Sequence, residues 1–266
     1  MSMSEREERA LRRWTPPGDT RFNRFLTNSV VSLSRGIMRG LNSLSVENAG
    51  AYSALIERRE RGLLTFSNHV SLFDDPLLLA NLELPAYGGI RWVGADAINF
   101  FGSGWKAFIF RAGKCVPIVR GAGFDQPGFY FLRDRLNEGA WVHIFPEGGR
   151  TRDPQALLTA PFKPGIGRLM VETRPIALPF YHYGMHEVLP VGTKTPRARK
   201  KVRILFGEPV DCDALISELD RNDGGALSGP RLWEALTAAC EESLRALQAE
   251  LNPAATVTAE PEEARV

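Results

Sequence analysis

Short apolar runs alternate with helix-like stretches through most of the chain. Runs of five to seven mostly apolar residues, bounded by glycine, proline or charged residues, are typical of buried strands. Such runs occur at 62–66, 89–94, 115–119, 141–145, 175–181 and 201–207. Apolar residues at helical spacing occur at 77–82, 101–111, 129–136 and 228–251. Strands that alternate with helices in this way predict an α/β fold.

The segment 22–44 carries apolar residues at alternating steps of four and three, which places them on one helical face. These residues are Phe22, Leu26, Val30, Leu33, Ile37, Leu41 and Leu44. The opposite face carries Arg24, Asn28, Arg35 and Arg39. Such a helix can lie in a membrane interface, and it can equally cover the core of the protein. The sequence thus predicts an amphipathic N-terminal helix within a membrane-docking segment at 19–61.

Other segments of the chain suggest further membrane contacts and flexible ends. The segment 101–111 has a second aromatic face, which is another candidate for membrane contact. The basic cluster at 194–201 is either a solvated loop or a contact for anionic lipid. We expect a flexible N-terminus at 1–18 and a disordered tail at 252–266, because the tail is rich in proline, alanine and glutamate.

Composition excludes several classes of protein. The 266 residues, 44% apolar and 24% charged, are enough for one globular catalytic domain. A net charge of +2 is too small for a nucleic-acid-binding surface spread over the chain. The three cysteines are far apart and odd in number, which predicts neither a disulfide framework nor a zinc site. We find no run of eighteen apolar residues for a spanning helix, and no cleaved targeting signal at the start.

The segment 68–76 combines a histidine with a carboxylate five residues later. His69 follows an apolar run, and Asp74 lies where a helix is expected to begin. At this spacing the carboxylate can hold one imidazole nitrogen and leave the other free to take a proton from a hydroxyl. The alternative is structural, with Ser71 capping the helix and Asp74 completing a variant capping box.

A second polar segment follows the apolar run at 141–145. Pro146 ends the expected strand, and the two glycines after Glu147 allow a positive φ or a close approach of the backbone. Glu147 and Arg150 are left on a loop, where the planar guanidinium of Arg150 suits a phosphate. Arg120, at the end of another apolar run, is a second phosphate candidate. Both arginines are also compatible with ordinary solvated positions.

Two histidines further along the chain have the spacing of a metal-binding pair. His182 and His186 stand four residues apart, as metal ligands on one helix do. Pro179 and Gly184 argue against a helix at this point, so we predict no metal site.

The two polar segments resemble the motif pair of the glycerolipid acyltransferase superfamily, which includes the lysophosphatidic acid and glycerol-3-phosphate acyltransferases. The sequence has Asn-His-x-Ser-x-x-Asp at 68–74 and Phe-Pro-Glu-Gly at 145–148. The stretches that look like the tafazzin family are 113–121, 141–148, 165–169 and 182–190. The resemblance implies a single acyltransferase domain at 62–251, with a mixed, mostly parallel sheet flanked by helices.

Carried onto the matching positions, the resemblance also implies roles for individual residues. His69 is expected to be the general base and Asp74 its partner. The expected contacts with the glycerophosphate part of the acceptor are Arg120, Glu147, Gly148, Gly149 and Arg150. Gly149 departs from the tafazzin pattern, which usually has a lysine there, whereas Arg150 agrees with the arginine of the broader superfamily.

This departure leaves the acyl donor open. A tafazzin-like enzyme moves acyl chains between phospholipids and lysophospholipids, notably cardiolipin, and requires no cofactor. The first alternative uses acyl-CoA as a co-substrate to acylate a lysophospholipid or lysophosphatidic acid, and the second is a catalytically silent lipid-binding protein. In each case we expect a peripheral membrane protein whose partners are phospholipids and lysophospholipids. The expected location is a mitochondrial membrane if the source is eukaryotic, or the cytoplasmic membrane face if it is bacterial.

Overall fold

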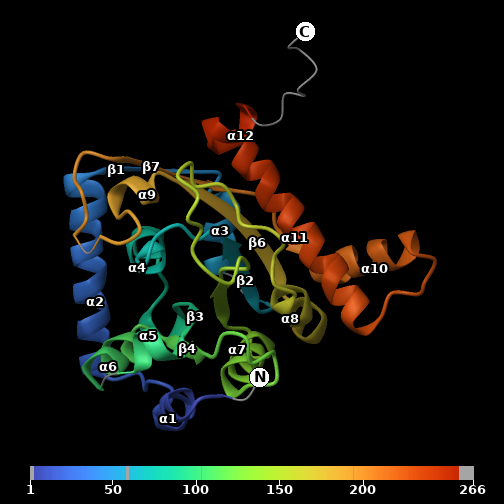
Figure 1. Cartoon of the computed structure of the whole chain (residues 1–266), viewed down its shortest axis with the longest axis horizontal. Helices are drawn as coiled ribbons and strands as arrows, with labels where there is room; N and C mark the ends of the chain where they lie inside the picture. Colours follow the sequence, from blue (N-terminus) through green and yellow to red (C-terminus); the bar gives the residue numbers. More distant parts are fainter. Residues whose placement is uncertain (1–2, 58–59, 103, 194, 258–266) are drawn as a thin grey trace.

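A mixed sheet forms the centre of the computed structural model, which describes residues 3–57, 60–102, 104–193 and 195–257 (Figure 1). Its strands are β1 (Ser43–Glu47), β2 (Leu63–Ser67), β3 (Trp92–Asp96), β4 (Cys115–Ile118), β5 (Trp141–Ile144), β6 (Ile176–Tyr183), β7 (Lys201–Phe206) and β8 (Val210–Asp211). Within the described residues the order is β1-β7-β6-β2-β5-β3-β4, and β8 pairs with β6. Only the pairs of β6 with β7 and with β8 are antiparallel there. The predicted fold class is therefore confirmed.

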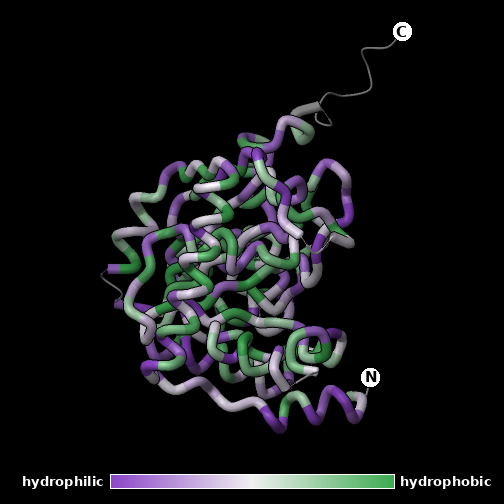
Figure 2. Tube along the Cα trace, turned by 90° about the vertical axis from the view of Figure 1, so that its left-hand side faces the viewer, coloured by the Kyte–Doolittle hydropathy of each residue, from purple (hydrophilic) through white to green (hydrophobic). Residues whose placement is uncertain are grey.

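Helices cover both faces of this sheet. They are α1 (Glu5–Arg13), α2 (Arg21–Arg35), α3 (Gly50–Glu57), α4 (Asp74–Leu78), α5 (Ala97–Phe101), α6 (Gly104–Ala112), α7 (Pro127–Asn137), α8 (Gly165–Thr173), α9 (Met185–Val188), α10 (Cys212–Asn222), α11 (Gly229–Leu251) and α12 (Pro253–Val257). Helices α7, α8, α10 and α11 pack on one face, whereas α3, α4 and α9 pack on the other. Figure 2 shows apolar positions concentrated in the middle of the molecule.

The alternation of side chains along each strand supplies both apolar layers. Leu63 belongs to the layer under α3 and α4, whereas its neighbour Leu64 belongs to the layer under α8 and α11. As a central parallel strand, β2 is buried on both sides, and three of its five residues are apolar, with Thr65 and Ser67 the polar ones. Helix α8 approaches α11 so closely that a Cβ atom on Gly167 would lie 2.0 Å from the Trp233 carbonyl oxygen. Only glycine therefore fits this contact.

The N-terminal helix is shorter than the apolar periodicity predicts. Helix α2 ends at Arg35, a π-helical turn continues to Leu41, and Leu44 lies in β1 opposite Val202 of β7. The side-chain amide of Asn42 donates to the Ile37 carbonyl oxygen at 2.9 Å and helps to end the turn. The prediction of one helix through Leu44 was wrong because long-range strand pairing overrides the local helical spacing.

The two faces of α2 also differ from a simple amphipathic pattern. Arg35 donates to the Ala80 carbonyl oxygen, and Arg39 donates to the Asn81 main chain and side chain, so both arginines face the protein. Large apolar side chains instead remain exposed, including Phe25 at 69% and Leu33 at 67%. The helices of the described residues are too short or too polar to cross a bilayer.

The two ends of the chain contain short helices. Helix α1 lies within the segment 1–18 and starts with a capping box between Ser4 and Glu7. Trp14, which follows α1, donates from its indole nitrogen to the Cys115 carbonyl oxygen at 3.0 Å. Helix α12 lies within the segment 252–266, of which residues 258–266 are outside the described part of the chain.

Candidate active site

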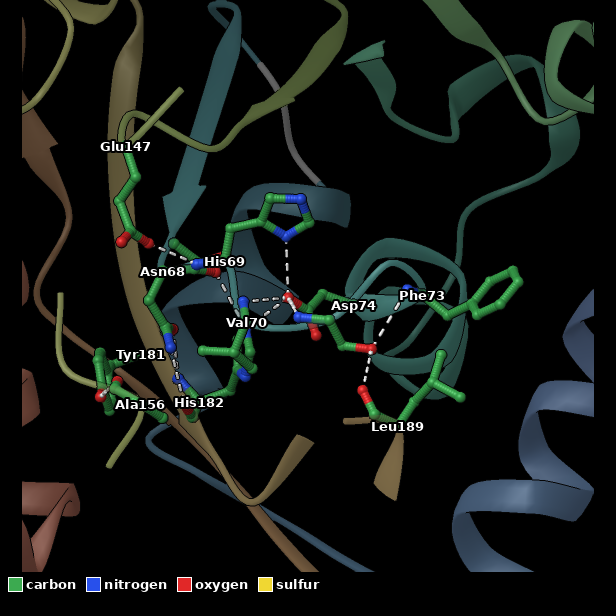
Figure 3. A network of polar contacts seen from close by, with 12 residues as sticks. Asn68, His69, Val70, Phe73, Asp74, Glu147, Ala156, Tyr181, His182 and Leu189 are labelled. Carbon is green, nitrogen blue, oxygen red and sulfur yellow. Dashed lines mark hydrogen bonds and ion pairs between the residues drawn. The ribbon is translucent and has the colours of Figure 1, made fainter. Parts of the chain in front are cut away.

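A histidine and an aspartate meet at the carboxyl end of the central strand β2. The turn after β2 presents His69, and α4 begins at Asp74. His69 Nδ1 lies 2.9 Å from Asp74 Oδ2, and the second ring nitrogen points away from the carboxylate (Figure 3). Asp74 Oδ2 also accepts the backbone N–H groups of Val70 and Ser71 at 2.7 and 2.8 Å. Asp74 therefore orients the imidazole and holds the turn at the same time.

The environment keeps Asp74 ionised. The residue is 1% exposed, and burial alone raises the pKa of its carboxyl group. Its contacts with His182 and His69 and the N–H of Ser71 outweigh burial, so the pKa of Asp74 lies below its ordinary value. The neighbouring carboxylate, Asp75, is engaged elsewhere, because it forms an ion pair with the buried Arg91.

The ring and the main chain of His69 are both fixed by the segment that follows β5. Phe145 stacks on the imidazole with a ring separation of 4.1 Å and an interplanar angle of 20°. The N–H of His69 donates to Glu147 Oε1 at 2.6 Å, and its carbonyl oxygen accepts the N–H of Thr151 at 2.8 Å. The two sequence motifs therefore interlock through the main chain of His69.

Glu147 lies behind the histidine-bearing turn. Its side chain links two main-chain N–H groups, those of His69 and of Thr159, the latter at 2.7 Å. The residue is 5% exposed and is not among the described residues that line the adjacent cavity. Burial raises the pKa of Glu147 to about 7.

A cavity of about 600 Å³ opens beside His69. Most of its walls are apolar and come from β3, β4, α7 and α8, with Val93, Ile118, Leu132 and Leu169 among them. A cavity with mostly apolar walls is suited to a hydrocarbon ligand.

The charged residues of this cavity are few. Arg120 lines it and pairs through Nε with Asp96 at 3.2 Å, while 56% of its side chain stays exposed. Gly149 lines it as well, but Arg150 is exposed and is not among the lining residues.

Lys163 is a cavity residue that the motifs did not identify. It follows no pattern that distinguishes it from a surface lysine, but its aliphatic stem lies across Gly148. A Cβ atom on Gly148 would lie 2.9 Å from Lys163 Cγ, and the φ of this glycine is +71°. Gly148, which also lines the cavity, is thus needed both for its backbone angle and for the passage of the lysine.

The remaining candidates do not form a metal site in the described residues. His182 lies in β6 and His186 in α9, so the two do not share one helical face. No cluster of three or more possible metal ligands occurs within the described ranges. The three cysteines are buried there as free thiols.

A family model described as Acyltransferase matches residues 48–183. The chain belongs to the acyltransferase family. Tafazzin of Drosophila melanogaster is 33% identical over 236 residues, covering 86% of this chain and 61% of that protein. A protein of Dictyostelium discoideum named Taffazin is 39% identical over 170 residues, covering 60% of this chain and 58% of its own. The chain spans about three fifths of the length of these two relatives.

Two other acyltransferases are similar to the chain. N-acylphosphatidylethanolamine synthase of Arabidopsis thaliana is 32% identical over 203 residues, covering 70% of this chain and 69% of that protein. The crystal structure of the 1-acyl-sn-glycerophosphate acyltransferase PlsC from Thermotoga maritima aligns with a TM-score of 0.61 and 19% identity. It covers 92% of this chain and 86% of that one, which shows a shared fold. The predicted resemblance to a tafazzin-like glycerolipid acyltransferase is confirmed.

Proposed function

We propose that this acyltransferase moves an acyl chain from a phospholipid to the hydroxyl of a lysophospholipid. The observation that carries this proposal is the His69–Asp74 pair, whose imidazole borders a cavity with mostly apolar walls. Asp74 holds Nδ1 and leaves Nε2 as a general base for the hydroxyl. The apolar walls support a site for the acyl chain beside the base.

The bonds of the proposed reaction balance without a cofactor. The lysolipid oxygen attacks the ester carbonyl of the donor while His69 Nε2 takes the hydroxyl proton. The bond from the acyl carbon to the donor oxygen then breaks, and Nε2 returns the proton to that oxygen. One ester replaces another, so the site must serve both directions. With acyl-CoA as the donor, the thiolate leaves instead.

Binding of the glycerophosphate part is assigned to the polar end of the cavity. Arg120 and the loop residues Gly148 and Gly149 line this end, and Lys163 adds a second cation. Arg150 lies on the same loop and would have to turn inward to reach the phosphate. Glu147 supports this region from behind through its hydrogen bond to the His69 N–H.

Peripheral docking on a membrane is supported by the exposed apolar side chains of α2 and α6. Phe22 of α2 and Phe108 of α6 have ring centroids 5.7 Å apart, so the two helices present adjoining apolar surface. Trp105 of α6 is 68% exposed. We propose a mitochondrial membrane for a eukaryotic source and the cytoplasmic membrane face for a bacterial one.

The test is an acyl-transfer assay with purified protein, labelled lysophospholipid and phospholipid vesicles, with and without acyl-CoA. Transfer without CoA is expected, and strict dependence on CoA would favour the alternative donor. His69→Ala should lower the rate by about a hundredfold to ten-thousandfold, the usual contribution of a general base. Lipid binding without transfer by the wild type would indicate a catalytically silent protein.

The position of the new bond must be measured as well, because one relative is named as an N-acylphosphatidylethanolamine synthase. Mass spectrometry distinguishes an ester on glycerol from an amide on ethanolamine. We expect the ester, and an amide as the main product would contradict the proposed acceptor.

A further inference from the structure

His182 lies behind the turn that carries His69, on the strand next to β2. The residue is 0% exposed and is not among the described residues that line the cavity. The β2–β6 ladder pairs Ser67 with Phe180, and the side chain of Asn68 extends it. The Asn68 amide donates to the His182 carbonyl oxygen and accepts the His182 N–H, both at 2.9 Å (Figure 3).

The imidazole of His182 returns a hydrogen bond to the same residue. Its Nε2 lies 3.0 Å from the Asn68 carbonyl oxygen, and a carbonyl only accepts, so Nε2 carries a proton. The same nitrogen lies 3.7 Å from Asp74 Oδ2, the oxygen that His69 contacts. Burial lowers the pKa of His182 more than Asp74 raises it. The buried Nδ1 of His182 has no hydrogen-bond partner among the described residues, so the neutral ring with its one proton on Nε2 fits this place.

One peptide group is thus held at both of its ends. The peptide that joins Asn68 to His69 accepts at its oxygen from His182 Nε2–H. It donates from its nitrogen to Glu147 Oε1 at 2.6 Å. The C=O and N–H of a trans peptide point in opposite directions within its plane, so contacts at both groups restrain the rotation of this peptide. The next peptide is held through the His69 carbonyl oxygen, which accepts the Thr151 N–H at 2.8 Å, and the two peptides together restrain the direction of the His69 Cα–Cβ bond.

We propose that His182 is a positioning residue for acyl transfer, which holds the Asn68–His69 peptide so that the His69 imidazole stays in line with Asp74. This inference rests on the proposed function of His69 as the base. The neutral state of His182 matters, because a cation at the same place would compete with His69 for the charge of Asp74. A neutral N–H donor supplies the contact and leaves that charge to the imidazolium formed at His69.

The first test compares His182→Gln with His182→Asn in the full-length protein. The glutamine amide reaches the place of Nε2 and can donate to the Asn68 carbonyl oxygen, whereas the asparagine amide is too short. We expect His182→Asn to lower kcat by about ten- to a hundredfold, as for a small misplacement of a catalytic group, with KM nearly unchanged. His182→Gln should recover most of this loss. Equal kcat values for wild type and His182→Asn would overturn the proposal.

A matched control separates positioning from simple stabilisation of the core. Asn42 is 9% exposed, and its side-chain amide joins the Ile37 carbonyl oxygen to the Lys200 N–H, without a hydrogen bond to His69, Asp74 or Asn68 among the described residues. Asn42→Ala should lower the melting temperature about as much as His182→Asn does but leave kcat within about threefold of the wild-type value. If both variants lower kcat in proportion to their loss of stability, His182 has only a structural role.

A second measurement does not depend on activity. We expect the proton between His69 Nδ1 and Asp74 to give a low-field proton resonance, because the two atoms are 2.9 Å apart, and Asp74→Asn should abolish and thereby identify it. This resonance should shift in His182→Asn and return in His182→Gln. A resonance unchanged in both variants contradicts the proposal, even if the wild type transfers acyl chains. A resonance that moves as expected in a protein without transfer would refute the proposed function alone.

Discussion

Replacing Glu147 with glutamine tests whether this residue holds the active site or binds substrate. In the structure both carboxylate oxygens accept main-chain N–H groups, from His69 at 2.6 Å and from Thr159 at 2.7 Å. Glutamine keeps one acceptor and turns its NH₂ group toward the other N–H. The unpaired buried N–H group should cost about 1–3 kcal/mol of stability.

Glutamine does not ionise, so the change also removes the ionisation of Glu147, whose pKa is raised by burial. The pKa of Glu147 is raised from 4.5 to about 7, so the folded state binds this proton more tightly than the unfolded state. The resulting contribution to stability is complete below pH 4.5 and is lost as the pH rises through 7. Between pH 5 and pH 8 the loss amounts to about 2–3 kcal/mol, because each pKa unit corresponds to about 1.4 kcal/mol.

Urea unfolding of wild type and Glu147→Gln at pH 5, 6, 7 and 8 measures this loss. The free energy of unfolding of the wild type, minus that of the variant, should fall by about 2–3 kcal/mol across the series. The exposed Glu83→Gln controls for the removal of one charge, and its difference from wild type should not follow this course.

The kinetics of Glu147→Gln test whether Glu147 instead binds the substrate. A residue that fixes the His69 main chain should affect kcat, whereas a residue that binds the acceptor should affect KM. We expect kcat to fall about tenfold or more, with KM for the lysophospholipid within about twofold. A flat stability difference combined with a raised KM would refute the role derived from the structure.

Two further predictions concern other parts of the molecule. Phe25→Ser combined with Leu33→Ser should weaken binding to phospholipid vesicles by at least about tenfold in a flotation assay, because each apolar side chain buried in the membrane contributes about 1.5–3 kcal/mol. Unchanged flotation would exclude α2 as the docking surface. Burial raises the pKa of Cys115 and Cys212 to about 12, so neither thiol should react with iodoacetamide at pH 8 unless urea unfolds the protein, and rapid labelling of the folded protein would contradict this.

The sequence identifies the central part of the sheet well because β2, β4, β5 and β6 are largely buried on both faces. The apolar runs predicted β2 to β7, since a strand between two helical layers has few polar positions. It does not identify β1, whose five residues are exposed or half-buried. Leu44 continues a helical spacing, and only pairing with Val202, far along the chain, makes it part of a strand. Local patterns contain no information about such a partner.

In the candidate site as well, contacts between near neighbours in sequence can be predicted, whereas contacts between distant segments cannot. The five-residue spacing of His69 and Asp74 predicts their contact, because a short turn limits where the two side chains can go. The direction of Glu147 could not be predicted, because a loop carboxylate after a strand can face solvent, substrate or the protein interior. The position of Lys163 at the cavity could not be predicted either, because its side chain reaches the cavity by lying across Gly148 in the folded protein.

The contacts that hold the histidine-bearing turn come from distant parts of the chain. Asn68 and His182 are 114 residues apart, and His69 and Glu147 are 78 residues apart. These contacts form only when β2, β5 and β6 are assembled, so the imidazole is oriented before a lipid arrives. Preorganisation of this kind lowers a barrier without reorganisation during the reaction. In the proposed exchange of one ester for another of nearly equal energy, the incoming and departing hydroxyls must meet the same base. A rigid imidazole can serve both, because neither direction requires it to move.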